Sequence, residues 1–217
     1  MLNSIIILLA ILLLAGLLFF EKRENRRGLL PTKTALSLLF IVAALVQAHP
    51  TQGYAVLVMV GLICCLAGDV FLALPQEKMF LSGLVSFLIG HIFYVIAFFL
   101  VSDLNRFTLI GGLATLAVGL GIYAWLRPHL GAMKIPVICY MVVISFMLCS
   151  AWTILGTSKL AAAARGLVFA GAVSFYVSDI LVARDRFLRN EFFNRFVGLP
   201  LYYLGQFLIA FSVGVMA

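Results

Sequence analysis

The feature that most constrains the fold is a series of eight long apolar segments separated by short polar connections. A helix that crosses a bilayer needs about 20 mostly apolar residues, and most of these segments approach that length. A lone strand could not satisfy its backbone hydrogen bonds in lipid, so each segment is predicted to be a helix. We therefore expect an all-α, polytopic membrane bundle of eight transmembrane helices near residues 2–20, 34–48, 54–74, 80–101, 107–126, 135–155, 160–182 and 197–216.

Composition excludes the other fold classes. Of the 217 residues, 65% are hydrophobic and 11% are charged, whereas a soluble domain is about 45–50% apolar and about 25% charged. A disordered chain needs low hydrophobicity and high charge. Because the spans leave no room for a soluble domain, we expect a single membrane domain over 1–217. We attribute the net charge of +7 to basic residues in the loops on one side of the membrane and not to nucleic-acid binding.

The basic residues predict an orientation. The first, third, fifth and seventh connections hold twelve of the fifteen lysines and arginines. Cytoplasmic loops carry such an excess, so these connections should be cytoplasmic and both termini should lie outside. We expect a multi-pass protein of the bacterial inner membrane. Pro31 is expected in a connection, and Pro200 is expected in the first turn of the last helix.

A weak internal repeat divides the chain. The third segment ends in GDVFLA at 68–73, and the seventh ends in SDILVA at 178–183. In the following segments, Gly83 and Gly90 have the same spacing as Gly198 and Gly205. This pattern predicts two tandem four-helix repeats, 1–105 and 106–217, with the same orientation in the membrane.

Two carboxylates are the main candidates for chemistry. Of the eight acidic residues, only Asp69 and Asp179 fall within predicted spans. An acid at such a position is costly and usually faces the bundle interior, although a capping or packing role is the structural alternative. Both lie one to one and a half turns from the cytoplasmic end, so they should share a depth near that leaflet. The remaining acids are expected to be solvated at Glu21, Glu24, Glu77, Asp103, Asp185 and Glu191.

Other polar residues could line the same site. A buried histidine is more often a hydrogen-bonded core residue than a catalyst, and tyrosines near a boundary are commonly anchors. Lysines at the inner ends could hold a lipid phosphate. Tyr202 could line the cavity too, and the residues that we assign to substrate binding are His91, Tyr94, Tyr140, Ser178, Tyr203, Gln206, Lys33 and Lys134. No ligand spacing suggests a metal, and we expect no cofactor.

Four short motifs, in order along the chain, resemble the YhhN-like family. They are GDVFLALP at 68–75, FLIGHIFY at 87–94, Ser178-Asp179 with Arg186-Phe187, and YYLGQ at 202–206. The resemblance covers nearly the whole chain. It implies a lysoplasmalogenase, related to animal transmembrane enzymes, which cleaves the vinyl ether of 1-alkenyl lysophospholipids to a fatty aldehyde and glycerophosphoethanolamine or glycerophosphocholine. It also implies that Asp69 and Asp179 are the catalytic aspartates.

The chemistry of a vinyl ether suits two carboxylates. Protonation of its β-carbon gives an oxocarbenium ion that water attacks, which needs an acid and a base. We predict that one aspartate carries a proton at rest and that the other stays ionised. The partners would be a lysophospholipid and membrane lipid. Two alternatives remain open, a small proton-coupled transporter and a non-catalytic lipid-binding protein.

Overall fold

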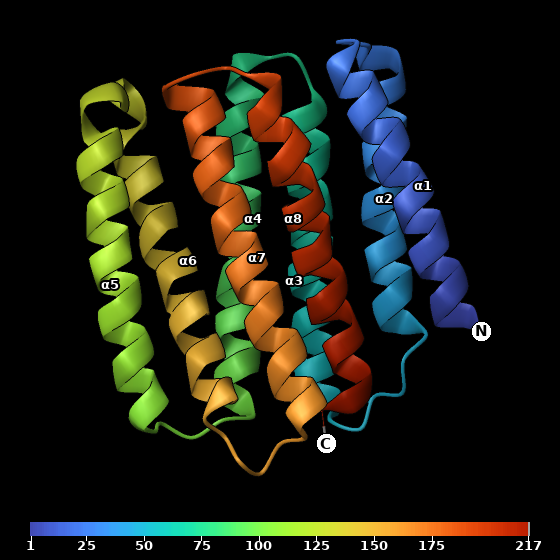
Figure 1. Cartoon of the computed structure of the whole chain (residues 1–217), viewed down its shortest axis with the longest axis vertical. Helices are drawn as coiled ribbons and strands as arrows, with labels where there is room; N and C mark the ends of the chain where they lie inside the picture. The colour runs from blue at the N-terminus through green and yellow to red at the C-terminus, as the bar shows by residue number, and fades with distance from the viewer. Residues whose placement is uncertain (217) are drawn as a thin grey trace.

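The computed structural model describes residues 1–216, and eight helices in this range are long and apolar enough to cross a membrane (Figure 1). The predicted all-α membrane bundle is therefore confirmed. The helices are α1 (Leu2–Lys22), α2 (Arg26–Leu45), α3 (Gln52–Ala73), α4 (Glu77–Leu100), α5 (Arg106–Leu126), α6 (Lys134–Leu155), α7 (Ala162–Phe187) and α8 (Phe192–Ser212). Short 3₁₀ turns lie at Arg127–His129, Gly131–Met133 and Val213–Val215.

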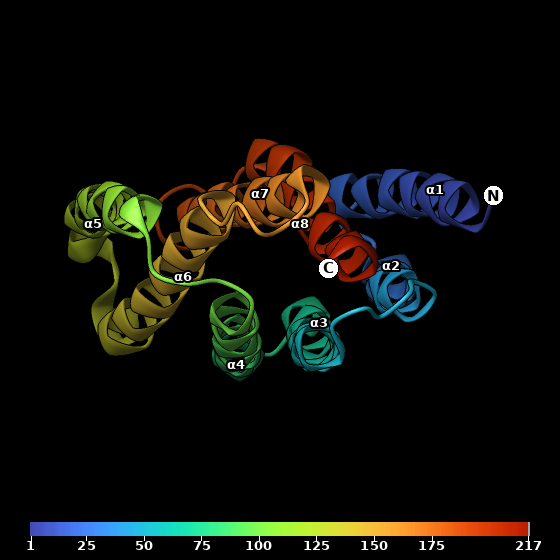
Figure 2. The same cartoon turned by 90° about the horizontal axis from the view of Figure 1, so that it is seen from below.

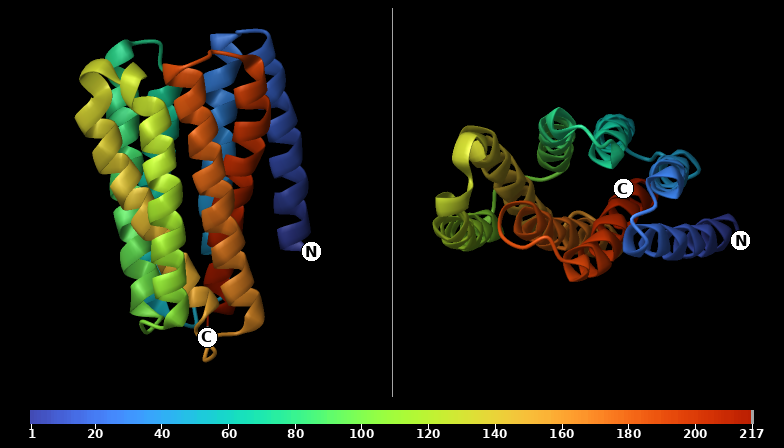
Figure 3. Two further views of the ribbon diagram at one scale, coloured as in Figure 1. Left: turned by 60° about the vertical axis from the view of Figure 1, so that its left-hand side comes forward. Right: turned by 90° about the horizontal axis from the view of Figure 1, so that it is seen from above.

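The helices run up and down the bundle in chain order. Seen from one end, α7 and α8 lie in one row between α5 and α1, while α2, α3 and α4 form a second row and α6 crosses obliquely (Figure 2). Figure 3 shows the same two rows from the opposite end. We call the end that carries the α1–α2, α3–α4, α5–α6 and α7–α8 connections the inner end, because the basic residues predict that it faces the cytoplasm.

Glycines set the closest helix contacts. A β-carbon added at Gly61 would lie 3.1 Å from the carbonyl oxygen of Gly90, and one at Gly205 would lie 2.8 Å from the carbonyl oxygen of Gly171. Small residues let helix backbones approach in membranes, where no hydrophobic effect drives helices together. The pairs α3–α4 and α7–α8 are thus packed in the same manner. The predicted tandem repeat itself stays a prediction.

Three helices extend beyond their predicted ends. Helix α2 begins at Arg26 and not near 34, α7 continues to Phe187, and α8 begins at Phe192. The added turns are polar, so hydropathy alone misses them. The expectations for Pro31 and Pro200 were therefore wrong, because both lie inside helices. These extensions place Lys33 and Asp185 on helices that border the inner end.

Candidate active site

A cavity of about 560 Å³ opens at the inner end of the bundle, and all eight helices contribute to its wall. Asp69 on α3 and Asp179 on α7 both line it. Asp69 lies four residues before the end of α3, or about 6 Å at 1.5 Å per residue. Because α7 is longer than expected, Asp179 lies eight residues from its end, or about 12 Å. The structure thus brings both intramembrane carboxylates to one cavity.

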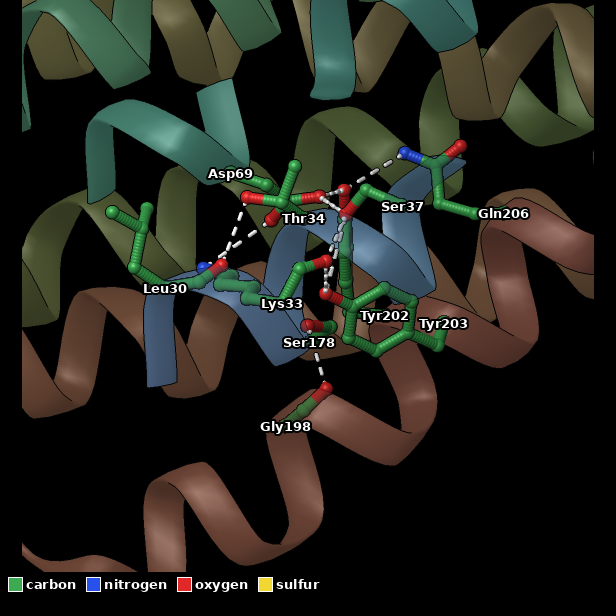
Figure 4. A network of polar contacts seen from close by, with 10 residues as sticks. All are labelled: Leu30, Lys33, Thr34, Ser37, Asp69, Ser178, Gly198, Tyr202, Tyr203 and Gln206. Carbon is green, nitrogen blue, oxygen red and sulfur yellow. Dashed lines mark hydrogen bonds and ion pairs between the residues drawn. The ribbon is translucent and has the colours of Figure 1, made fainter. Parts of the chain in front are cut away.

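Asp69 is held by three donors. Its side chain is almost fully buried, and Nζ of Lys33 lies 3.2 Å from Oδ1. The hydroxyl of Ser37 donates to Oδ2 at 2.7 Å, and the hydroxyl of Tyr202 donates to the same oxygen (Figure 4). A buried carboxylate is tolerated where such partners satisfy it. This network gives both oxygens of Asp69 a partner in the cavity wall.

Asp179 has a different environment. It is partly exposed to the cavity, and its Oδ2 accepts a hydrogen bond from the hydroxyl of Tyr140. Among residues 1–216, no lysine or arginine lies within ion-pair distance of it. The adjacent Ser178 donates to the carbonyl oxygen of Gly198 at 2.9 Å and so joins α7 to α8. The two aspartates therefore differ in their partners, since only Asp69 faces a cation.

Three aromatic rings pack together at the deep side of the cavity, and two of them, Phe87 and Tyr202, line it. Phe87 on α4, Phe175 on α7 and Tyr202 on α8 pack edge to face, with ring centroids 5.2–6.3 Å apart. We call these three residues the aromatic floor. His91 packs behind it, 4.5 Å from the ring of Phe175, with no exposed surface.

His91 is held in one orientation by its own helix. Its Nδ1 donates to the carbonyl oxygen of Phe87 at 2.5 Å, since a carbonyl can only accept. Nε2 is buried without a hydrogen-bond partner among the described residues. His91 does not line the cavity.

The other residues assigned to substrate binding divide into two groups. Lys33, Tyr140 and Ser178 line the cavity beside the aspartates. The remainder do not line it, and they are His91, Tyr94, Tyr203, Gln206 and Lys134. The structure therefore brings together only part of the predicted set.

Residues behind the floor bind one another. The hydroxyl of Tyr94 donates to Gln206 at 2.8 Å, and the amide of Gln206 lies 3.4 Å from the hydroxyl of Tyr202. The hydroxyl of Tyr203 lies 3.3 Å from that of Ser37. These contacts link the core to the oxygens that hold Asp69. Lys134 is separate from them, as an exposed residue at the start of α6.

The mouth of the cavity carries charges that the sequence did not indicate. Glu21 and Asp185 were expected to be solvated, and this is wrong, since their side chains are only 16% and 18% exposed. Arg195 on α8 lies 3.4 Å from Glu21 and 3.0 Å from Asp185. Arg186 also lines the mouth and stacks over the ring of Phe80 at 4.6 Å. The extensions of α7 and α8 explain the error, because they place Asp185 and Arg195 on helices at the rim, where Arg195 also contacts Glu21.

Ser37 and Arg195 were not among the predicted site residues. Ser37 follows Lys33 by one helical turn, so the spacing could have indicated it once α2 was known to begin at Arg26. Arg195 had no comparable signal, since Glu21 lies far away in the sequence and Asp185 was expected to be solvated. Among the described residues, no group of three or more His, Cys, Asp or Glu side chains is placed to hold a metal ion.

Comparison with known proteins identifies the family. The YhhN family model matches residues 29–213. The chain is 32% identical to lysoplasmalogenase TMEM86A of Homo sapiens, over 80% of this chain and 72% of that protein. It is 31% identical to lysoplasmalogenase TMEM86B of Rattus norvegicus, over 87% of this chain and 84% of that protein.

A bacterial relative is more distant. The chain is 28% identical to the lysoplasmalogenase of Mycobacterium bovis, over 77% of this chain and 62% of that protein. No solved structure matches this chain. The family model covers most of the chain, including both cavity aspartates, and the human and rat relatives exceed 30% identity over most of its length. This multi-pass membrane protein therefore belongs to the YhhN family.

Proposed function

We propose that this protein is a lysoplasmalogenase, which hydrolyses the vinyl ether bond of 1-alkenyl lysophospholipids. The observation that carries the proposal is the placement of two carboxylates, in different environments, on one cavity at the inner end. The names of the human, rat and mycobacterial relatives support the same activity. The substrate would be a lysolipid with an ethanolamine or choline headgroup.

The reaction adds one water across the vinyl ether. A proton is added to the β-carbon, and the positive charge that forms is shared between the α-carbon and the ether oxygen. Water attacks the α-carbon and loses a proton, giving a hemiacetal. The hemiacetal collapses to a fatty aldehyde and releases the glycerol hydroxyl of the glycerophospho headgroup. One acid and one base suffice, and each proton transfer by a positioned group contributes about 10²–10⁴-fold.

We assign the acid to Asp179. The hydroxyl of Tyr140 donates to its Oδ2, which leaves Oδ1 to carry the proton toward the cavity. No cation among the described residues lies within ion-pair distance to favour the ionised form. When the proton leaves, the same Tyr140 hydroxyl stabilises the carboxylate that forms.

We assign the base to Asp69. The ammonium of Lys33 and the hydroxyls of Ser37 and Tyr202 favour its ionised form. As a carboxylate it would stabilise the oxocarbenium ion and accept a proton from the attacking water. Two carboxyl groups in unlike surroundings can divide these roles within one site.

The mouth of the cavity suits the headgroup. The vinyl ether bond of the lysolipid would reach the aspartates while its phosphate stays near the cations Arg186 and Arg195 at the rim. The basic residues of the inner connections favour a position of this rim at the cytoplasmic leaflet of a bacterial inner membrane. Single cysteines at Lys78 and Asp103, labelled from each side with an impermeant reagent, would test this orientation.

The test of the function is a comparison of three lysolipids. Purified protein is incubated with alkenyl, alkyl and acyl lysophospholipids of one chain length and one headgroup. Aldehyde released from the alkenyl form alone is expected, and in D₂O the aldehyde should carry a solvent deuterium at C2. Binding of all three lipids with no cleavage would contradict the proposal and favour a lipid-binding protein.

A further inference from the structure

The aromatic floor stands in the way of a hydrocarbon chain that would run deeper between α4 and α8. Its three rings pack against one another beside the aspartates, and His91 packs behind them. On the side between α4 and α7, Phe80 packs edge to face on Phe187 near the mouth. A lysolipid whose vinyl ether reaches the aspartates must therefore lead its chain out sideways.

A second hollow begins where such a path would end. A groove of about 600 Å³ lies between α5 and α6, and apolar side chains form most of its surface. Several of them are large and exposed on the outer face of the bundle, among them Leu116, Leu120 and Phe146. In a membrane this face meets lipid, so the groove is open to hydrocarbon chains.

The groove and the catalytic cavity share a wall. Met141 lines both of them. Tyr176, which lines the cavity, also approaches the groove, since a β-carbon added at Gly119 would lie 3.8 Å from its hydroxyl and 3.5 Å from Oγ of Ser145. Methionine is unbranched and flexible, so this part of the wall can yield to a chain more easily than a branched residue.

Glycines on α5 leave room for the groove beside a firm contact between α5 and α6. At the outer end α5 is tied to α6, because Asn105 donates to the carbonyl oxygen of Thr153 and Thr108 bonds the Thr153 hydroxyl. Farther along the helix, α5 lines the groove with Gly112 and Gly119. Helix α5 lies at the edge of the bundle, where no further helix covers this side (Figure 1).

We propose that the α5–α6 groove binds the single hydrocarbon chain of the lysolipid and connects the catalytic cavity to the bilayer past Met141. The occupant is the alkenyl chain before cleavage and the aldehyde chain after it. This inference rests on the proposed function for the identity of the chain. Its geometry rests on the aromatic floor and on the wall that the two hollows share.

A matched pair of variants tests the groove. In Gly119→Leu the new side chain enters the groove, whereas in Gly121→Leu it meets nothing within 4 Å of its β-carbon and extends away from neighbouring side chains. For a long-chain alkenyl lysolipid, Gly119→Leu should raise KM about tenfold, as expected when about two methylene groups lose their burial. Gly121→Leu should keep the wild-type KM, and a short-chain alkenyl substrate should be cleaved alike by all three proteins.

The outcomes separate this inference from the proposed function. If wild-type protein releases no aldehyde from any alkenyl lysolipid, the proposed function fails. If wild-type protein cleaves and Gly119→Leu has the wild-type KM for the long chain, the groove assignment is overturned.

Crosslinking gives a second readout that does not need cleavage. The probe is an alkyl ether lysophospholipid with a diazirine at the end of its chain. Photolysis should label residues within 112–123 and 138–149. Labelling confined to α3, α4 or α8 would overturn the assignment, because the chain would then pass the aromatic floor.

Discussion

The buried ion pair between Lys33 and Asp69 leads to the sharpest prediction about stability. Their side chains are 9% and 2% exposed, and the two charged atoms lie 3.2 Å apart. Removing one partner of such a pair leaves the other charge buried alone, at a cost of about 3–5 kcal/mol. In Lys33→Met, Ser37 and Tyr202 still donate to the carboxylate, so we expect the lower end of this range, about 3 kcal/mol.

The loss should be visible as a lower melting temperature. For a chain of about 200 residues, 1 kcal/mol shifts Tm by about 2–4 °C, so Lys33→Met should melt about 6–12 °C below wild type. To measure this shift, the purified protein is heated in detergent, and the folded protein that remains at each temperature is quantified by size-exclusion chromatography. Lys134→Met is the matched control, because Lys134 is exposed, and its Tm should equal that of wild type.

A double variant tests the cause of the loss. Lys33→Met combined with Asp69→Asn removes both charges, so it should regain most of the lost stability while remaining inactive. The reasoning is refuted if Lys33→Met has the Tm of wild type. It is also refuted if the double variant is no more stable than the single one, because the cost would then come from lost packing and not from an unpaired charge.

Three further predictions concern separate parts of the molecule. Tyr140→Phe should lower kcat about 10- to 100-fold without loss of folded protein, because its hydroxyl stabilises the charge that forms on the catalytic acid. Gly205→Ala should destabilise the bundle by about 1–3 kcal/mol in thermal unfolding, since its β-carbon would lie 2.8 Å from a backbone oxygen of α7, whereas Gly121→Ala has room and should not. Lys159 holds the pKa of Asp103 below its usual range, so Lys159→Met should return that pKa to normal in an NMR titration. The ion pair contributes to stability at neutral pH, and this contribution is lost as pH falls through the lowered pKa of Asp103. Because exposed pairs contribute little, the Tm of Lys159→Met at neutral pH should be close to that of wild type.

The sequence was sufficient for the fold because hydropathy acts along the chain. Eight apolar segments must become eight helices in lipid, and all eight are present. The same measure failed at helix ends such as Arg26 and Phe187, where the residues are polar although the backbone remains helical. Length and composition therefore predict the number of spans better than they predict the ends of those spans.

The site was predictable only in part, for a related reason. An acid within a span is costly, so Asp69 and Asp179 stand out in the sequence without any structure. Their partners do not, because the Lys33–Asp69 and Tyr140–Asp179 contacts join residues that are 36 and 39 positions apart. His91 was expected to bind the substrate, but it packs behind the aromatic floor and does not line the cavity, and the sequence cannot reveal such a barrier.

The central claim is that Asp179 and Asp69 act as the acid and the base of vinyl ether hydrolysis. The most direct measurement is the rate of aldehyde release from an alkenyl lysophospholipid by purified Asp179→Asn and Asp69→Asn, with the exposed Asp103→Asn as control. The account predicts that each site variant loses at least about 100-fold in kcat while Asp103→Asn keeps the wild-type rate. Near-wild-type aldehyde release by either Asp179→Asn or Asp69→Asn would contradict it.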